Sequence, residues 1–350
     1  MSEKYIELID RLSDFHTLST NEYKYLIENS DNGNLVSYAA EKAVEARKKI
    51  YGNKIYIRGL IEIGNICKND CLYCGIRASN ALCDRYRLTE SEILACCDEG
   101  YPLGFRTFVM QGGEDGSFSD EFMCSVISKI KAKYPDCAIT LSIGERSRES
   151  YRRMFDSGAD RFLLRHETAT KEHYEKLHPE KMSFDNRMRC LYDLKDIGYQ
   201  VGCGFMVGSP YQTNEHLARD LKFIEEFSPD MCGIGPFMPA KNTPFESHSA
   251  GSASLTCFLL SLIRLIKPNI LLPATTALAS VSEDGRVRGI LSGANVIMPN
   301  LSPAENRKKY NLYDNKKSFG SEAAESLDML REQMNGIGYE IEVNKGNIIK

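Results

Sequence analysis

Eight short apolar segments, separated by stretches with helical character, constrain the fold of this 350-residue chain more than any other feature. Such alternation predicts an α/β protein with a parallel sheet, and eight strands are the number that closes a (β/α)8 TIM-type barrel. An open, doubly wound sheet is the rival architecture, but it commonly has about five to seven strands. The eight segments are residues 55–63, 107–110, 138–143, 161–164, 200–206, 231–234, 270–272 and 295–298.

The regions on either side of these segments predict two additions to the barrel. Residues 1–53 have a helical pattern interrupted by a turn sequence, which predicts an N-terminal helical extension. The barrel itself is expected at residues 54–314. Residues 315–350 are expected to hold a C-terminal helix, at about 322–334, and a short edge strand at 339–343.

Charge and composition disfavour several classes of protein. The chain has 44 basic and 48 acidic residues, a net charge of −4, so we expect no nucleic-acid partner. The first residues carry charges, and the longest apolar run contains Arg264, so we expect neither a signal peptide nor a membrane span. We therefore expect a cytoplasmic protein, in which the 12 cysteines are thiols or metal ligands and not disulfides.

Three cysteines lie within eight residues, directly after the first apolar segment. Cys67, Cys71 and Cys74 have the spacing C-x3-C-x2-C, so one loop can hold a single metal centre. A structural zinc site needs four ligands, and no fourth Cys or His lies close by, Cys83 being the nearest. Three thiolates suit a [4Fe–4S] cluster with one open iron. The alternative is three buried thiols, but the polar residues between them disfavour a buried strand.

Polar or glycine-rich residues follow most of the other predicted strands, where a barrel builds its active site. Gly113 and Glu114 follow the second strand, and Ser142 lies at the end of the third. Arg165 and Glu167 follow the fourth strand. Because they are two positions apart, they face the same side and would bind a zwitterion, unless they form a structural ion pair. His166, between them, points the other way and is predicted to be structural.

The remaining strand ends add further candidates. Met206 begins a segment after the fifth strand that could contact an adenine, and Arg187 lies on the helix before that strand. Thr275 and Thr276 follow the seventh strand, although one of them could simply cap the next helix. Met298 ends the eighth strand, where it could instead be a core residue.

The cysteine loop, with Tyr73 just before the last cysteine, resembles the radical S-adenosylmethionine (SAM) superfamily. The resemblance implies that the three cysteines bind three irons of a [4Fe–4S] cluster and that the amino and carboxylate groups of SAM bind the fourth. It also implies that an electron from the cluster splits SAM into methionine and a 5′-deoxyadenosyl radical.

Longer strings resemble one family within that superfamily, the HydE maturases of [FeFe]-hydrogenase. They are residues 67–75, 113–115, 163–169 (LLRHETA), 206–210, 233–236 (GIGP), 273–277 (PATTA) and 293–300 (GANVIMPN). The resemblance implies reductive cleavage of SAM and action on an iron–CO–cyanide–cysteine complex during assembly of the di-iron part of the hydrogenase active site. The implied partners are a second radical SAM maturase, a scaffold GTPase and an electron donor such as ferredoxin or flavodoxin.

The family resemblance also assigns roles to residues. The implied SAM contacts are Tyr73, Gly113, Glu114, Ser142, Arg165, Glu167, Arg187 and Met206. The implied wall of a substrate cavity, lower in the barrel, is Thr140, Arg161, Met231, Thr275, Thr276, Met298 and Tyr310.

One feature departs from the family pattern. Many members carry three more cysteines near the C-terminus for a second cluster, whereas residues 312–326 contain none here. Ser318, Ala323 and Ala324 stand where they would be expected, so no second cluster is expected.

Two alternative functions are compatible with the same residues. One is another radical SAM reaction on the same barrel, as in methylornithine synthase or biotin synthase. Biotin synthase would need a further set of barrel ligands that this sequence does not offer, and LLRHETA is not expected in methylornithine synthase. The other alternative is a non-catalytic iron–sulfur carrier, which would not need an eight-stranded barrel with charged strand ends.

Overall fold

Six parallel strands form the continuous part of the barrel in the computed structural model, which describes residues 2–314 and 323–349. These six strands pair in the order in which they occur along the chain, and the parallel connections between them run through helices outside the sheet. In order around the ring the strands are β2 (Gly59–Gly64), β3 (Thr107–Gly112), β4 (Ala138–Ser142), β5 (Arg161–Leu163), β6 (Gln200–Cys203) and β8 (Met231–Cys232).

The ring is closed by three single backbone bridges instead of long strands. Leu271 pairs with Met231, and Pro273 pairs with Val296, which brings the seventh and eighth apolar segments into the ring. Asn300 pairs with Leu60 of β2, and the Leu60 amide donates to the Pro299 carbonyl at 2.8 Å. The predicted eight-membered α/β barrel is therefore confirmed, with its strand ends gathered at one end.

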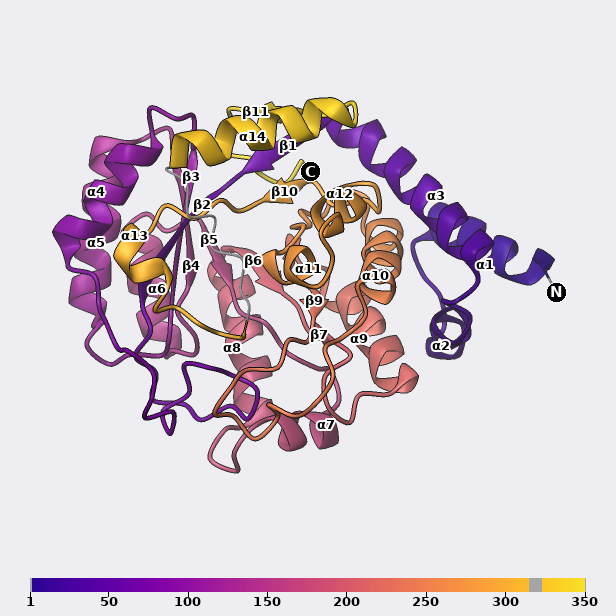
Figure 1. Cartoon of the computed structure of the whole chain (residues 1–350), viewed down its shortest axis with the longest axis horizontal. Helices are drawn as coiled ribbons and strands as arrows, with labels where there is room; N and C mark the ends of the chain where they lie inside the picture. Colours follow the sequence, from indigo (N-terminus) through magenta and orange to yellow (C-terminus); the bar gives the residue numbers. More distant parts are fainter. Residues whose placement is uncertain (1, 315–322, 350) are drawn as a thin grey trace.

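Ten helices follow the strands in the described barrel, and Figure 1 shows the larger ones surrounding the ring. Side-chain caps begin several of them. Thr89 forms a capping box with Glu92 at α4, and Ser119, Ser147 and Ser183 cap α5, α6 and α8. The helices are α4 (Glu90–Gly100), α5 (Asp120–Lys133), α6 (Arg148–Asp156), α7 (Lys171–Leu177), α8 (Phe184–Ile197), α9 (Asn214–Phe227), α10 (Ala253–Ile266), α11 (Thr276–Val281), α12 (Gly285–Ile290) and α13 (Ala304–Arg307).

Two predicted strands are divided in two, and a third is followed by a second short strand. The segment 55–63 becomes β1 (Lys54–Ile57) and β2, and β1 joins a separate three-stranded sheet between β10 (Val296–Ile297) and β11 (Glu340–Glu342). The segments 200–206 and 231–234 each continue into a second short strand, β7 (Met206–Val207) and β9 (Gly235–Pro236). Gly204 makes the first of these breaks possible, because a Cβ there would lie 2.1 Å from the Gly233 carbonyl oxygen.

The N-terminal helices pack on the outside of the barrel, at one flank of the molecule in Figure 1. They are α1 (Ser2–Phe15), α2 (Thr20–Glu28) and α3 (Gly33–Tyr51). On α2, the Tyr23 hydroxyl donates to Glu225 of α9 at 2.9 Å. On α3, the buried Arg47 donates to the carbonyls of Ile290 and Ala294 at 3.2 and 3.0 Å. Among the described residues, no helix has the length and apolar character to cross a membrane.

The C-terminal segment covers the end of the barrel where the strands begin. It contains α14 (Ala323–Gly336), β11 and a tail that reaches Arg161, the first residue of β5. The Arg161 guanidinium is fully buried and donates to Thr107, to the Lys345 carbonyl and to Asn347. The family resemblance assigns Arg161 to the wall of a substrate cavity. The structure instead places its side chain against the tail, because it leaves the N-terminal end of its strand.

Replacing Arg161 by Met should therefore destabilise the protein. The change removes the hydrogen bonds that the buried guanidinium donates to Thr107, to the Lys345 carbonyl and to Asn347, which should lower the free energy of unfolding by about 3 kcal/mol. Urea unfolding of the metal-free protein, followed by circular dichroism, measures this. The control Arg152→Met, at an arginine whose side chain is 47% exposed, should change the value by less than about 0.5 kcal/mol. Equal midpoints for the two variants would contradict the structural role.

Candidate active site

A cavity of about 340 Å³ opens at the end of the barrel where the strands finish. All three cysteines of the loop line it, and so do all the residues predicted to contact SAM: Tyr73, Gly113, Glu114, Ser142, Arg165, Glu167, Arg187 and Met206. From the predicted substrate wall, Thr275, Met298 and Tyr310 line the same cavity. Thr140, Arg161, Met231 and Thr276 are not among its lining residues.

The cysteine loop is tied to the neighbouring strand end by hydrogen bonds to sulfur. The amides of Asn69 and Glu114 each donate to Cys67 Sγ at 3.4 Å, and the Lys68 amide donates to the Glu114 carbonyl at 3.0 Å. Only glycine fits at position 113, since a Cβ there would lie 2.3 Å from the Ile66 carbonyl oxygen. The loop and the Gly113–Glu114 turn therefore form one unit.

Burial sets the protonation of the cysteines. It raises the pKa of Cys67, raises that of Cys71 well above its ordinary value, and raises that of Cys74 to about 12. Metal ligation requires the thiolate form, so a bound centre must supply the charge that stabilises it. In the described part of the chain, no group of three Cys, His, Asp or Glu side chains has the arrangement needed to hold one metal ion.

Arg85 ties the cysteine loop to neighbouring backbone, a role that no sequence motif predicts. Arg85 donates to four backbone carbonyls, of Asn65, Ile76, Arg77 and Asn80, at 2.6 to 3.1 Å. Its contribution could not be foreseen, because a guanidinium bound to carbonyls has no sequence signature.

Arg165 and Glu167 lie just past the end of β5 and face the cavity. Their side chains are 3.7 Å apart, from Arg165 Nε to Glu167 Oε2, which is too long for a hydrogen bond. Within the described residues, Arg165 Nε and Nη2 and Glu167 Oε2 are buried without a hydrogen-bond partner. The two charges form an ion pair with each other, but these buried atoms still lack hydrogen bonds, which a bound ligand would supply. This pair therefore has the chemistry to bind a zwitterion.

His166 has the structural role predicted for it. It is fully buried, its Nδ1 accepts from the Gly204 amide at 3.2 Å, and its Nε2 lies 3.4 Å from Asp220 of α9. Asp220 also accepts from the Ala169 amide at 2.6 Å. These contacts hold the segment that carries Arg165 and Glu167 on the opposite side.

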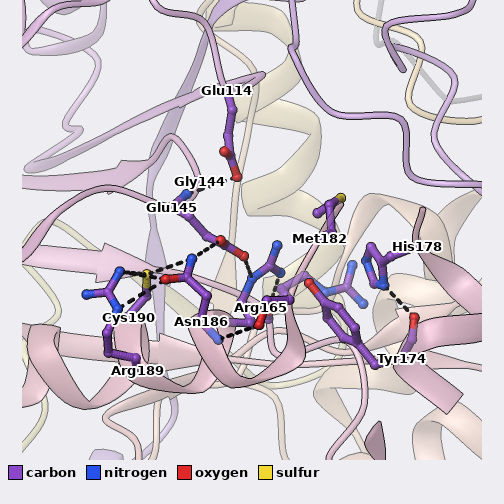
Figure 2. A network of polar contacts seen from close by, with 12 residues as sticks. Glu114, Gly144, Glu145, Arg165, Tyr174, His178, Met182, Asn186, Arg189 and Cys190 are labelled. Carbon is purple, nitrogen blue, oxygen red and sulfur yellow. Dashed lines mark hydrogen bonds and ion pairs between the residues drawn. The ribbon is translucent and has the colours of Figure 1, made fainter. Parts of the chain in front are cut away.

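Glu145 follows the end of β4, a position from which the sequence alone predicts no particular role for it. Figure 2 shows it between Glu114 and the start of α8. Its carboxylate accepts from Arg187 Nε at 2.6 Å, and Arg187 Nη1 donates to the Arg165 carbonyl at 2.6 Å. Burial acts to lower the pKa of Arg187, but Tyr174 and Glu145 outweigh it and raise that pKa well above its ordinary value.

Tyr73 is held from its hydroxyl end. His178 Nδ1 lies 2.9 Å from the Tyr174 carbonyl, so Nδ1 carries the proton and Nε2 accepts from the Tyr73 hydroxyl at 3.2 Å. Burial lowers the pKa of His178 to about 3 and raises that of Tyr73 well above its usual range. Both groups are therefore neutral at physiological pH, and the ring of Tyr73 is fixed beside the cysteines.

Comparison with known proteins defines the class first. The family model described as the Radical SAM superfamily matches residues 61–224. Among solved structures, methylornithine synthase (PylB) superposes with a TM-score of 0.83 at 24% identity, covering 96% of this chain and 97% of that one. The hydrogenase maturase HydG superposes with a TM-score of 0.80 at 21% identity, covering 97% and 76%. These structural likenesses show the fold, and the chain is a radical SAM enzyme.

Sequence relatives define the family within that class. The [FeFe] hydrogenase maturase subunit HydE of Thermotoga maritima is 42% identical over 274 residues, which are 78% of each chain. The 3-methylornithine synthase of Methanosarcina acetivorans is 28% identical, over 84% of this chain and 83% of that protein. The chain belongs to the HydE family. Membership in the radical SAM superfamily implies a [4Fe–4S] cluster and SAM, and the cavity fits both, with three thiols on its wall and an unsatisfied Arg165–Glu167 pair.

Replacing Cys71 by Ala should abolish the iron–sulfur centre, because two thiolates cannot hold three irons of a cluster. Anaerobic reconstitution followed by iron and sulfide analysis and visible absorption measures the loss. The matched control is Cys124→Ala, on α5, which should keep the full iron content. A Cys71→Ala protein with unchanged iron content would show that this residue is not a ligand.

Proposed function

We propose that this enzyme cleaves SAM reductively in this cavity and acts in maturation of the [FeFe]-hydrogenase active site, on an iron–CO–cyanide–cysteine precursor. The observation that carries the proposal is the pairing of two features in one cavity. One is the wall with three thiols, and the other is the Arg165–Glu167 pair, in which Nε, Nη2 and Oε2 are buried and lack hydrogen-bond partners in the described residues.

In this proposal, different residues bind the cluster and SAM. Cys67, Cys71 and Cys74 would hold three irons, and Arg165 and Glu167 would bind the carboxylate and ammonium of the methionine part of SAM. When bound, the cluster and SAM supply a carbon-centred radical by transfer of one electron. The closed barrel keeps water from the reacting groups, which suits radical chemistry.

The barrel interior supports an anionic substrate. Arg58, between β1 and β2, is buried and donates to Met231 Sδ of β8 at 2.9 Å. Because β8 is not a neighbour of β1 or β2 in the ring, this contact crosses the interior. Burial and the charge of Arg161 lower the pKa of Arg58 well below its usual range. Within the described residues, Arg58 Nε and Nη2, Thr140 Oγ1 and Thr275 Oγ1 are buried without hydrogen-bond partners. Of these residues, Thr275 lines the cavity, and a cyanide-bearing complex bound there would offer an acceptor for its hydroxyl.

We propose that the enzyme carries one cluster. Residues 312–326 contain no cysteine that could hold a second one. Of the positions where such ligands are expected, Ser318 lies outside the described residues, while Ala323 and Ala324 are at the start of α14 and offer no ligand atoms.

We also propose the partners that this chemistry requires. The similarity to the maturases HydE and HydG suggests a second radical SAM maturase as the source of the precursor. A scaffold GTPase would receive the product. A one-electron donor such as ferredoxin or flavodoxin would reduce the cluster.

The second candidate is a methylornithine synthase-like rearrangement of lysine. The structural likeness to PylB favours it. The sequence identity to 3-methylornithine synthase is lower than to HydE, at 28% against 42%.

Replacing Arg165 by Ala should spare the cluster and weaken SAM binding about tenfold or more, since a charged hydrogen bond to SAM is lost. Iron analysis and equilibrium binding of SAM to the reconstituted protein measure the two effects. The control is Arg219→Ala, at an arginine of α9 whose side chain is 51% exposed. Unchanged SAM affinity in the Arg165 variant would remove that residue from the site.

The substrate proposal is tested by turnover. The reconstituted enzyme receives SAM and a reductant, with either the iron–CO–cyanide–cysteine complex or lysine. Mass spectrometry follows methionine, 5′-deoxyadenosine and adenosylated products. We expect products that depend on the iron complex. Cleavage of SAM with a rearranged lysine product would favour the second candidate, and cleavage that ignores both compounds would contradict both substrate assignments.

A further inference from the structure

We propose that Glu145 is a positioning residue for the SAM site, holding Glu114, Arg187 and Arg165 in one arrangement. The inference rests on the SAM site proposed above. It is independent of the hydrogenase substrate, since it concerns SAM binding alone. Glu145 itself is not among the residues that line the cavity.

Glu145 joins three elements of the barrel. Its backbone amide donates to Glu114 Oε1 at 2.9 Å, which fixes the side chain at the end of β3. Its carboxylate accepts from Arg187 Nε at 2.6 Å and from Asn186 Nδ2, both at the start of α8. Figure 2 shows Glu145 between Glu114 and Asn186.

The link continues to the end of β5 through Arg187. The Nη1 group of Arg187 donates to the Arg165 carbonyl at 2.6 Å, so the guanidinium fixes the backbone from which the Arg165 side chain leaves. Three strand ends, of β3, β4 and β5, are thereby connected at the rim of the cavity. In the described part of the chain, Glu145 is the residue that joins the two, through its backbone amide to Glu114 and through its carboxylate to Arg187.

Burial makes the charge of Glu145 essential to this arrangement. The Arg187 side chain is 7% exposed and that of Glu145 is 15% exposed. A buried guanidinium that loses its carboxylate is left uncompensated, so it must move toward solvent or another acceptor. Either movement would release the Arg165 carbonyl.

The preceding residue, Gly144, allows the turn that brings Glu145 next to Glu114. Gly144 has φ +78°, and a Cβ there would lie 2.1 Å from Glu114 Cγ. Only glycine therefore allows the chain after β4 to turn against Glu114, which brings the Glu145 amide within reach of its carboxylate.

The test is the isosteric substitution Glu145→Gln in the full chain with its reconstituted cluster. The neutral amide keeps the shape and removes the charge that holds Arg187. We expect unchanged iron content and a SAM dissociation constant raised about tenfold or more. The change that SAM causes in the electron paramagnetic resonance spectrum of the reduced cluster should also need correspondingly more SAM. Glu149→Gln, at an exposed residue of α6, is the matched control and should bind SAM normally.

A merely structural ion pair predicts a different result, namely a lower unfolding temperature with unchanged SAM affinity, and that result would overturn the proposal. Should Glu145→Gln fail to fold or to load iron, Asn186→Ala decides the matter. It removes one donor to the Glu145 carboxylate while leaving the charge, and we expect about a two- to fivefold loss of SAM affinity. Normal affinity in that variant would then refute the role. Failure of the enzyme on the iron complex, with SAM affinity altered as expected, would affect only the proposed substrate.

Discussion

The closed ring of parallel backbone pairing is the constraint on which the rest of the structure depends. Parallel strands start at one end of the ring and finish at the other, so every loop that follows a strand reaches the same rim. The ring closes where Asn300 pairs with Leu60, just before the cysteine loop that begins after β2. Closure thus brings the last strand, with Met298 and Asn300, beside the first strand and its cysteines.

Buried charged side chains differ between the two ends of the barrel in whether the protein itself satisfies their hydrogen bonds. At the end where the strands begin, Arg161 is satisfied by the C-terminal tail and by Thr107, and so is structural. At the other end, Arg165 and Glu167 have buried atoms that lack hydrogen-bond partners in the described residues. A protein interior tolerates such atoms poorly, so they mark where a ligand contributes to stability as well as to chemistry.

Much of the candidate site could be predicted from sequence, because its chemistry is carried by short strings. The spacing of Cys67, Cys71 and Cys74 lies within one loop, and the motifs at positions 113–114 and 165–167 follow strand ends directly. Residues deeper in the barrel were harder to place. Whether Thr140 or Arg161 faces the cavity depends on the register of each strand and on the side chain's direction at its end, which adjacent residues do not reveal.

The sequence by itself determined the alternation that requires a parallel barrel, the three thiols of one loop and the paired charges after β5. These are local properties, fixed by residue type and spacing. Only the tertiary structure decided that Glu145 joins Glu114 to Arg187, that Arg85 braces the cysteine loop, and that the C-terminal tail binds Arg161. These contacts join residues that are distant in the chain, and they form because burial leaves each charge only the partners that folding brings near.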